Sequence, residues 1–471
     1  MNYKKNNLIE GSILKSIFAL SIPIIFANIL QTAYQLTDTF WVGRLGANAV
    51  AAVSISFPII FLLVSLGGGL AMAGTILVAQ YKGKGDKKST DHIATQTIAM
   101  VLIVSFILSV LGYILAPILI KMMGVEPVIF KDSLSYMRIS MIGVVFMFGF
   151  AVFQSLMRGV GDVKTPMYIV LGTVLLNLIL DPLFIFGYGS IPAFGVGGAA
   201  VASIATEGLS AIIGIFILIK GKYNVQINLN NLKPDFKLIK KMFFLGLPVS
   251  IEQSARALGM TAMTFLVAGF GTIALAAYGI GGRMLSFIII PALGFSMATS
   301  TLVGQNIGAG KNDRAEKVIK ISAIIGFTVL SILGLFAFIF AEQLCAFFMP
   351  GEIEAIKYAT LFMKIMAPTF GFIGLHMTYG GAFRGAGETF VPMILSIISL
   401  WAIQFPLAFV LSRYTSWNEI GIWVAFPISN IIATIITVLW FMKGTWKLKK
   451  ITEEIEISEK ISEETIIEEG L

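Results

Sequence analysis

The sequence predicts an all-α membrane protein with about twelve transmembrane helices in two homologous six-helix lobes. Composition is the first observation: 57% of the 471 residues are hydrophobic, only 13% are charged, and the mean hydropathy is +0.88. Water-soluble domains are much less apolar. The second observation is a regular series of long apolar runs, and the third is an internal repeat. Together they predict two bundles of membrane-spanning helices.

The apolar runs are separated by short segments that contain charged residues, glycine or proline, and each run is long enough to cross hydrocarbon as a helix. We expect the first six spans near residues 13–43, 49–80, 92–117, 133–156, 166–188 and 195–219. The second six are expected near residues 240–269, 274–305, 316–341, 357–381, 391–412 and 420–442. The first run contains Pro23 and is followed by no small-residue cleavage pattern, which indicates a retained helix rather than a signal peptide.

Positive charge is concentrated in alternate connections between the spans. The basic connections contain Lys82, Lys84, Lys87 and Lys88; Arg158 and Lys164; the lysines from Lys220 to Lys241; Lys311, Arg314, Lys317 and Lys320; Arg384; and the lysines from Lys443 to Lys450. The positive-inside rule therefore predicts that these connections and both termini are cytoplasmic, in a multi-pass protein of the cytoplasmic (inner or plasma) membrane. The formal charge of +8 is explained by these loops, so no nucleic-acid partner is expected.

The chain repeats itself at an offset of 225 residues, which is 248 − 23 for the pair Pro23 and Pro248. Glycines, alanines and glutamines keep the same offset: Gly46/Gly271, Ala51-Ala52/Ala276-Ala277, Gly69/Gly294, Gln80/Gln305, Gly83/Gly308 and Gly85/Gly310. At an offset of 226, Arg158-Gly-Val-Gly-Asp162 matches Arg384-Gly-Ala-Gly-Glu388. Because each half contains about six spans, an even number, both halves are expected to enter the membrane in the same orientation.

The repeat and the charge pattern predict four regions. Residues 1–219 form an N-terminal six-helix lobe, and residues 220–241 form a cytoplasmic connector. Residues 242–443 form a C-terminal six-helix lobe, and residues 444–471 form an acidic cytoplasmic tail that is rich in glutamate.

Two carboxylates lie inside apolar runs, where a charge is costly and usually functional. Asn177 and Asp181 are four residues apart and therefore share one helix face, next to Pro182, which frees a backbone carbonyl. In the first run Asp38 follows Gln31, Tyr34 and Gln35 at seven, four and three residues, so that the four form one polar stripe. We expect Asp38 and Asp181 to face each other, with Tyr34 and Gln35 as candidates for a substrate cavity.

The repeat shows that this carboxylate pair is asymmetric. Asp38 corresponds to Met263 (38 + 225). Asp181 corresponds to Leu407 (181 + 226) or, if the alignment slips by one or two residues, to Pro406 or Phe405. A purely structural pair would be expected in both halves. Its presence in the N-terminal half alone favours a specific role there.

The sequence lacks the motifs of nucleotide hydrolysis and of metal-dependent or nucleophilic catalysis. The segment Gly83-Lys-Gly-Asp-Lys-Lys-Ser-Thr90 is not a P-loop, because Lys88 stands where the second glycine is needed. Two histidines and one cysteine are dispersed along the chain and do not predict a metal or nucleophile site. We therefore expect a secondary transporter without a cofactor rather than an enzyme.

The chain resembles the multidrug and toxic compound extrusion (MATE) family, in particular its DinF-like branch, over all twelve spans. The most specific pieces are Thr37-Asp38-Thr39-Phe40, Asn177-Leu-Ile-Leu-Asp-Pro-Leu-Phe-Ile-Phe186, Gly195-Val-Gly-Gly-Ala-Ala-Val-Ala-Ser203 and the two Arg-Gly-x-Gly-Asp/Glu loops. The resemblance implies a cation site for H⁺ or Na⁺ in the N-terminal lobe. Its residues map to Asp38, Asn177, Asp181 and Ser203, with Thr206 as the alternative to Ser203 and Gln31 nearby; Na⁺ would bind at Asp38, Asn177 and Asp181.

The function implied is a multidrug antiporter that exports amphipathic, often cationic organic compounds in exchange for H⁺ or Na⁺ as its two lobes rock. Its expected partners are small organic substrates and the lipid bilayer, and the chain is expected to be monomeric. A flippase for lipid-linked precursors is the alternative, although it would be expected to show a basic cavity. Five ionisable residues keep open roles at this stage: Glu207, Glu252, Arg256, Arg283 and His376.

Overall fold

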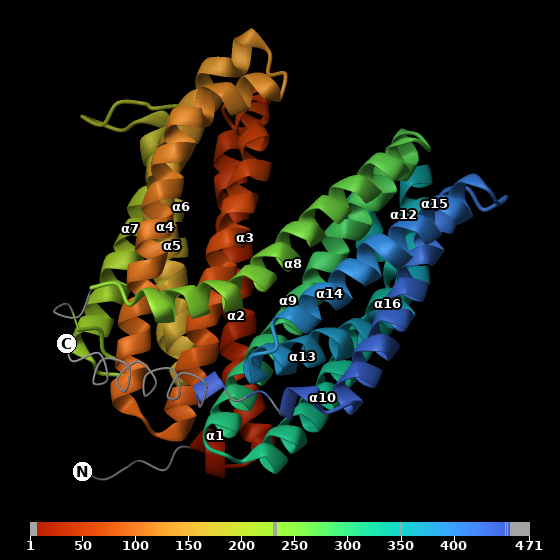
Figure 1. The fold of residues 1–471 in the computed structure, drawn as a ribbon. Coiled ribbons are helices and arrows are strands. Elements are labelled where there is room, and N and C mark those ends of the chain that lie inside the picture. The colour runs from red at the N-terminus through yellow and green to blue at the C-terminus, as the bar shows by residue number, and fades with distance from the viewer. Residues whose placement is uncertain (1–6, 229–232, 349–350, 448, 450, 453–471) are drawn as a thin grey trace. The chain divides into compact units, whose positions relative to one another are not determined.

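The computed structural model describes residues 7–228, 233–348, 351–447, 449 and 451–452 (Figure 1). Positions 229–232 of the expected connector and most of the expected acidic tail, residues 453–471, lie outside the described residues. The helices of the first half are α1 (Asn7–Glu10), α2 (Ile13–Gly43), α3 (Ala47–Lys84), α4 (Lys87–Met122), α5 (Pro127–Val160), α6 (Lys164–Phe186) and α7 (Val196–Lys220).

The second half contains more helix boundaries than the first. Its elements are α8 (Phe236–Ala268), α9 (Thr272–Gly308), α10 (Asn312–Ile339), α11 (Ala341–Phe348), α12 (Ile353–Met366), η2 (Ala367–Thr369), α13 (Phe370–Ala386), α14 (Phe390–Ile397), η3 (Ile398–Gln404), α15 (Phe405–Arg413), α16 (Glu419–Met442) and η4 (Thr445–Lys447). Residues 353–386 and 390–413 each form one continuous span, and the second of these includes the π-helical turn η3.

The predicted all-α membrane fold is confirmed. Eleven spans in the described chain are long and apolar enough to cross a bilayer, and within the same residues no strand occurs beyond one isolated bridge, Tyr188 to Ile191. The remaining predicted span, the seventh (residues 240–269), corresponds to α8, whose 33 residues would also reach across a membrane. Its polar residues Glu252, Gln253 and Arg256 lower its mean hydropathy below that of the other spans.

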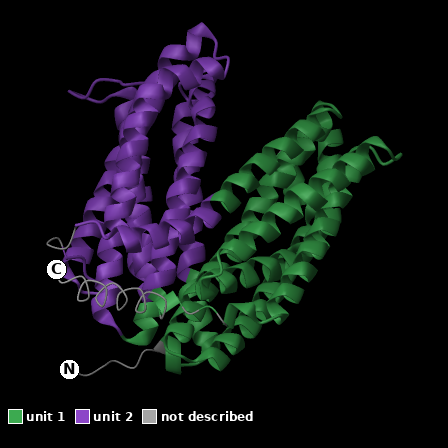
Figure 2. Cartoon of the chain, in the orientation of Figure 1, with its two compact units in different colours: residues 1–22, 79–85, 251–471 green, residues 23–78, 86–250 purple. Residues whose placement is uncertain are grey.

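The described chain divides into two compact units (Figure 2). Unit 2 contains residues 23–78 and 86–250, and unit 1 contains residues 1–22, 79–85 and 251–471. The expected lobe boundaries were 219 and 242, whereas the units change at residue 250, and unit 1 also takes up the start of α2 and the end of α3. Two of the boundaries between the units lie inside helices, next to Pro23 in α2 and close to Pro248 in α8, rather than in the loops between helices.

The two halves repeat the same packing order within their own units. In unit 2, α5 packs against α4 and α7, and α6 packs against α7. In unit 1, α13 packs against α10 and α16, and α15 packs against α16. Since α13, α10, α15 and α16 occupy the repeat positions of α5, α4, α6 and α7, the internal repeat of the sequence is a repeat of helix packing.

The ends of α3 and α9 pack closely against each other in unit 1. A Cβ atom on Gly83 would lie 2.0 Å from the backbone oxygen of Gln305, and one on Gly308 would lie 1.8 Å from the backbone oxygen of Gln80. The two contacts exchange under the 225-residue offset, so each glycine meets the glutamine of the other repeat. Only glycine allows two helix backbones to approach this closely.

The two ends of the described chain also meet in unit 1. The Arg314 guanidinium donates to the carbonyl of Gly11, and Asn306 donates to the carbonyl of Leu8 at 3.3 Å. Near the other terminus, Lys447 pairs with Glu316 on α10. The N-terminal segment and η4 therefore lie at the same end of α10, where the α9–α10 connection is also found.

Candidate cation site

Helix α6 places an amide and a carboxylate side by side in the interior of unit 2. Asn177 and Asp181 are both fully buried, and the Asn177 amide donates to Oδ1 of Asp181 at 2.9 Å. The spacing of four residues produces this contact, because it brings two side chains onto one face one turn apart. The polar pair predicted on this helix is therefore already assembled within a single element.

Asp38 of α2 completes the group together with α7. Ser203 donates its hydroxyl to Oδ2 of Asp38 at 3.2 Å, and the Asp38 carboxyl also interacts with the side chains of Asp181 and Asn177. Three helices thus bring Asp38, Asn177, Asp181 and Ser203 together.

Three oxygen atoms of this group are buried and receive no hydrogen bond in the described chain. They are Oδ1 of Asp38, Oδ1 of Asn177 and Oδ2 of Asp181. Buried acceptors without donors are costly and are usually satisfied by a ligand or ion. Two carboxylate oxygens and one amide oxygen form the hard, all-oxygen donor set that suits a proton or an alkali cation.

The site is not a conventional metal centre. No group of three or more His, Cys, Asp or Glu residues with the geometry of a metal centre is found among the described residues. A site of two carboxylates and an amide does not need such a group, because Na⁺ is held by oxygen ligands of several kinds. The donor set fits a weakly bound, exchangeable cation better than a permanently held transition metal.

Thr206, the sequence alternative to Ser203, is placed one step further from the carboxylates. Its hydroxyl lies 2.7 Å from the hydroxyl of Tyr34, which is only 7% exposed, and it also donates to the carbonyl of Ala202. Ser203 therefore makes the direct contact with Asp38, while Thr206 positions Tyr34. Gln31 and Gln35 are exposed, and neither side chain forms a hydrogen bond within the described residues.

Two further residues lie near the site although the sequence analysis did not assign them to it. Glu207 on α7 is an electrostatic neighbour of Asp38, and so is Tyr136 on α5. Glu207 follows Ser203 by four residues, a spacing that could have signalled a shared face. Tyr136 has Asp132, Ser133 and Ser140 at helical spacing on its own helix, but this pattern does not indicate that Tyr136 lies near Asp38 of α2, so only tertiary packing could identify it.

An apolar cluster borders the site one helical turn beyond the carboxylates. It consists of buried residues of α2, α3, α6 and α7, with Trp41 and Tyr136 packed against it: Val42, Ala49, Ala52, Ile185, Val196 and Ala199. Helices α6 and α7 approach closely here, since a Cβ on Gly198 would lie 2.3 Å from the backbone oxygen of Phe184. An apolar border of this kind lowers the local dielectric constant, which strengthens electrostatic interactions of the carboxyl groups beside it.

Unit 1 contains a polar cluster of the opposite character. Glu252 of α8 is 3% exposed, and it accepts from the Arg384 guanidinium at 2.7 and 2.8 Å and from Arg256 at 3.2 Å. Ser396 donates to the same carboxylate at 3.2 Å. The expected pair of Glu252 and Arg256 is present, but Arg384, which is 132 residues away in sequence, is the stronger partner.

The other residues with open roles are placed as follows. Nδ1 of His376 lies 2.9 Å from the hydroxyl of Thr437, so this histidine is hydrogen bonded between α13 and α16. Arg283 is exposed on α9. Glu207 has no ion-pair partner within its own unit among the described residues. Of these residues, Glu207 is the one that adds a further carboxyl group near Asp38.

A family model described as MatE matches the chain twice, at residues 23–183 and 248–410. The chain belongs to the MatE family. The two matches begin at Pro23 and Pro248, which are 225 residues apart (248 − 23), so the model recovers the internal repeat. The first match contains Asp38, Asn177 and Asp181, and the second match covers the corresponding part of the other half. MatE membership places the chain among transporters rather than enzymes.

The relatives agree with this assignment along the whole chain. The probable multidrug resistance protein YoeA of Bacillus subtilis is 29% identical over 451 residues, which are 95% of this chain and 97% of YoeA. A crystal structure of MATE in complex with MaL6 is 26% identical with a TM-score of 0.89, covering 95% of this chain and all of that one. An outward-facing multidrug resistance MATE family transporter of the MOP superfamily is 27% identical with a TM-score of 0.86, over 96% and 100% of the two chains.

Proposed function

We propose that the protein is a multidrug antiporter that exports amphipathic, often cationic organic compounds in exchange for H⁺ or Na⁺. The observation that carries the proposal is the set of three buried oxygens without donors on Asp38, Asn177 and Asp181. A proton or Na⁺ bound there satisfies these oxygens, and its release leaves two carboxylates in a water-poor pocket. The two states of the site differ in charge, and coupling needs such a difference in free energy.

The position of the site favours the DinF-like branch of the family. Its carboxylates come from α2 and α6 in the N-terminal half, whereas the buried acid of the C-terminal half, Glu252, is bound by two arginines. An acid neutralised in this way does not offer free oxygens to a cation. We therefore assign coupling to Asp38 and Asp181, with Ser203 as a ligand-orienting residue.

The flippase alternative requires a basic cavity among the buried polar groups of the membrane spans, where a pyrophosphate group could be held. The two arginines of the Glu252 cluster are engaged with a carboxylate, and the site in unit 2 is acidic. The antiporter is therefore the better supported of the two functions. We further propose a monomer in the cytoplasmic (inner or plasma) membrane, without a cofactor and with both termini in the cytoplasm; the meeting of both terminal segments at one end of α10 supports the last point.

The test is efflux of a fluorescent cationic dye from proteoliposomes, first with an imposed pH gradient and then with an imposed Na⁺ gradient. We expect one of the two gradients to drive efflux, and the gradient that does so identifies the coupling ion. Asp38→Asn keeps the shape of the side chain but removes its charge, so we expect coupled efflux to fall to the level of empty liposomes. Asp132→Asn, at an exposed position on α5, is the matched control and should transport as the wild type does.

Two results would contradict the proposal. If neither gradient drives efflux by the wild-type protein, the antiporter assignment is wrong and lipid-linked substrates should be tried instead. If Asp38→Asn transports at the wild-type rate under a saturating gradient, coupling does not run through α2.

A further inference from the structure

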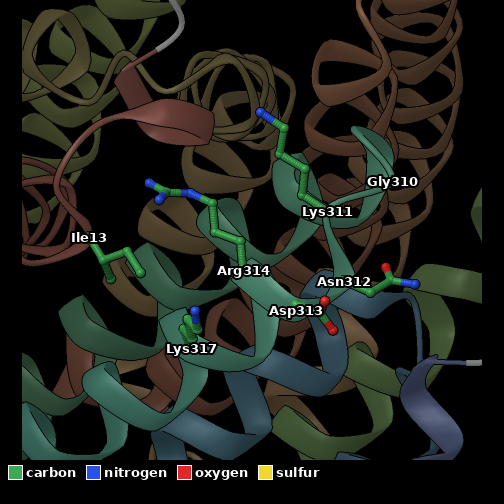
Figure 3. A pocket seen from close by; sticks show the side chains of 7 residues that line it. All are labelled: Ile13, Gly310, Lys311, Asn312, Asp313, Arg314 and Lys317. Atoms are coloured by element: carbon green, nitrogen blue, oxygen red, sulfur yellow. The ribbon is translucent and has the colours of Figure 1, made fainter.

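A pocket in unit 1 lies where α9 is joined to α10, away from the carboxylates described above. It has a volume of about 410 Å³, and Figure 3 shows the seven residues that line it: Ile13, Gly310, Lys311, Asn312, Asp313, Arg314 and Lys317. A volume of this order is typical of small-molecule sites, which range from about 300 to 1,000 Å³. The pocket is therefore large enough for a phosphate group together with the atoms attached to it.

The charge of the lining is positive. Lys311, Arg314 and Lys317 contribute three positive charges and Asp313 one negative charge, which leaves a formal balance of +2. In Figure 3 the guanidinium of Arg314 and the side chain of Lys317 lie on the side of Ile13, whereas the Asp313 carboxyl lies on the other side, next to Asn312. The cations of Arg314 and Lys317 are thus available to an anion that Asp313 does not directly oppose.

These cations are only partly satisfied by the protein itself. Lys311 is 3.7 Å from Glu10, and Arg314 donates through Nη2 to the carbonyl of Gly11. The Nε atom of Arg314 is buried without an acceptor, and Lys317 has no ion pair or hydrogen bond within the described chain. A phosphate oxygen in the pocket would give the half-buried Arg314 guanidinium and the exposed Lys317 ammonium an anionic acceptor.

The repeat provides an independent comparison with the same place in the other half. Asp86 is the N-cap of α4, where it accepts from the amide of Ser89 at 3.0 Å. The equivalent residue is Lys311 (86 + 225), the N-cap of α10, and it makes no side-chain cap. A lysine cannot accept a hydrogen bond, so the first amides of the 28-residue helix α10 keep their donors free. The second half therefore lacks the N-cap acceptor of the first half, although Asp313 stands in the first turn of α10 without forming a side-chain cap.

We infer that the pocket of Lys311, Arg314 and Lys317 binds a phosphate group, which takes the place of the missing acidic cap of α10. Phosphate oxygens would accept from the free amides at the start of α10 and from the Arg314 and Lys317 side chains. Ile13 begins the first membrane span at the pocket wall, so the headgroup of an anionic phospholipid reaches the pocket from the bilayer surface. A soluble phosphate offers the same chemistry.

The inference is tested by native mass spectrometry of the detergent-solubilised full chain. Three probes are titrated separately: dioleoylphosphatidylglycerol, dioleoylphosphatidylcholine and inorganic phosphate. We expect phosphatidylglycerol to bind more tightly than phosphatidylcholine, whose cationic headgroup cancels the phosphate charge. If inorganic phosphate binds and phosphatidylglycerol has no advantage over phosphatidylcholine, the ligand is a soluble phosphate rather than a lipid.

Variants link the binding to this pocket. Lys317→Gln removes a charge that has no partner in the described chain, and we expect it to weaken phosphate-group binding by about tenfold. Asp313→Asn removes the opposing charge and should strengthen binding. Lys88→Gln, at the position equivalent to Asp313 in the first half, is the matched control and should leave binding unchanged. Each variant is first checked for an unaltered thermal midpoint, so that loss of binding is not loss of folding.

The inference is overturned if Lys317→Gln and Lys311→Gln, singly and combined, bind both phosphatidylglycerol and phosphate as the wild type does. It is equally overturned if Lys88→Gln weakens binding as much as Lys317→Gln, because the binding would then reflect overall positive charge.

Discussion

At the scale of single residues, the buried carboxylates of the two units differ in their hydrogen-bond partners. Asp38 and Asp181 retain oxygens without donors, whereas the Glu252 carboxylate accepts four hydrogen bonds from Arg384, Arg256 and Ser396. A carboxylate with free oxygens can exchange a cation, but one that is fully bonded to arginine serves to hold helices together. The hydrogen bonds therefore distinguish the proposed coupling acids from an acid that holds helices together.

This distinction predicts the effect of Glu252→Gln on stability. The variant leaves the buried Arg384 guanidinium without its anionic partner, and breaking a buried ion pair costs about 3–5 kcal/mol. We expect a clearly lower thermal midpoint of the purified protein. Unfolding is measured by intrinsic tryptophan fluorescence. Glu342→Gln, at an exposed site in the first turn of α11, is the control and should cost less than about 1 kcal/mol. An unchanged midpoint for Glu252→Gln would show that the cluster does not stabilise unit 1.

At the scale of helices, the symmetric crossing of α3 and α9 explains why glycine recurs in both repeats. Gly83 and Gly308 stand where a Cβ would meet the backbone of Gln305 and of Gln80. The Gln80 amide also donates to the carbonyl of Gly385 at 3.0 Å, which connects the crossing to the end of α13. The backbone contact fixes the axial position at which α3 and α9 cross, and the hydrogen bond from Gln80 to Gly385 depends on that position.

We accordingly expect Gly83→Ala to destabilise the protein by about 1–3 kcal/mol, because the added methyl forces backbone apart from backbone. Gly68→Ala is the matched control in the same helix, since nothing lies within 4 Å of the added methyl. That change should be neutral or stabilising by up to about 1 kcal/mol, because alanine favours helix over glycine. Equal thermal midpoints for the two variants would show that the crossing tolerates a side chain.

At the scale of the whole molecule, two repeats with the same packing order carry different chemistry. The position of Asp38 is occupied by Met263 in the second half, and Met263 is 1% exposed. The residues equivalent to Gln31, Tyr34 and Gln35 are Arg256, Gly259 and Met260. Leu400 packs against Gly259, where a Cβ would lie 2.1 Å from its side chain, so an apolar group fills the space that Tyr34 occupies in the first half.

The double variant Asp38→Asn/Met263→Asp tests this asymmetry. We expect no recovery of coupled dye efflux, because a carboxylate at Met263 has neither the equivalent of Asn177 and Asp181 nor a hydroxyl partner. The new acid should also lower the thermal midpoint, since an unpaired buried charge is costly. The single variant Met263→Asn, which adds a polar group of similar shape without charge, controls for the loss of packing. Restored coupling in the double variant would prove the two halves interchangeable.

The sequence by itself determined the helical membrane fold, the two-fold repeat and the polar faces that carry Asp38, Asn177 and Asp181. These features are local: hydropathy reports the length of each span, and a spacing of four residues reports a shared helix face. The hydrogen bond between Asn177 and Asp181 follows from that spacing alone. The repeat is visible because both halves keep their glycines and prolines at one offset.

Only the tertiary structure decided which helix faces meet. Ser203 rather than Thr206 reaches Asp38, Arg384 reaches Glu252 across 132 residues, and Tyr136 and Glu207 join the surroundings of Asp38. The sequence periodicity of one helix does not determine how that helix is rotated, or shifted along its axis, relative to another helix. Those are set by close backbone contacts such as that of Gly198 with Phe184, where a difference of one residue in register would bring another side chain to the carboxylate.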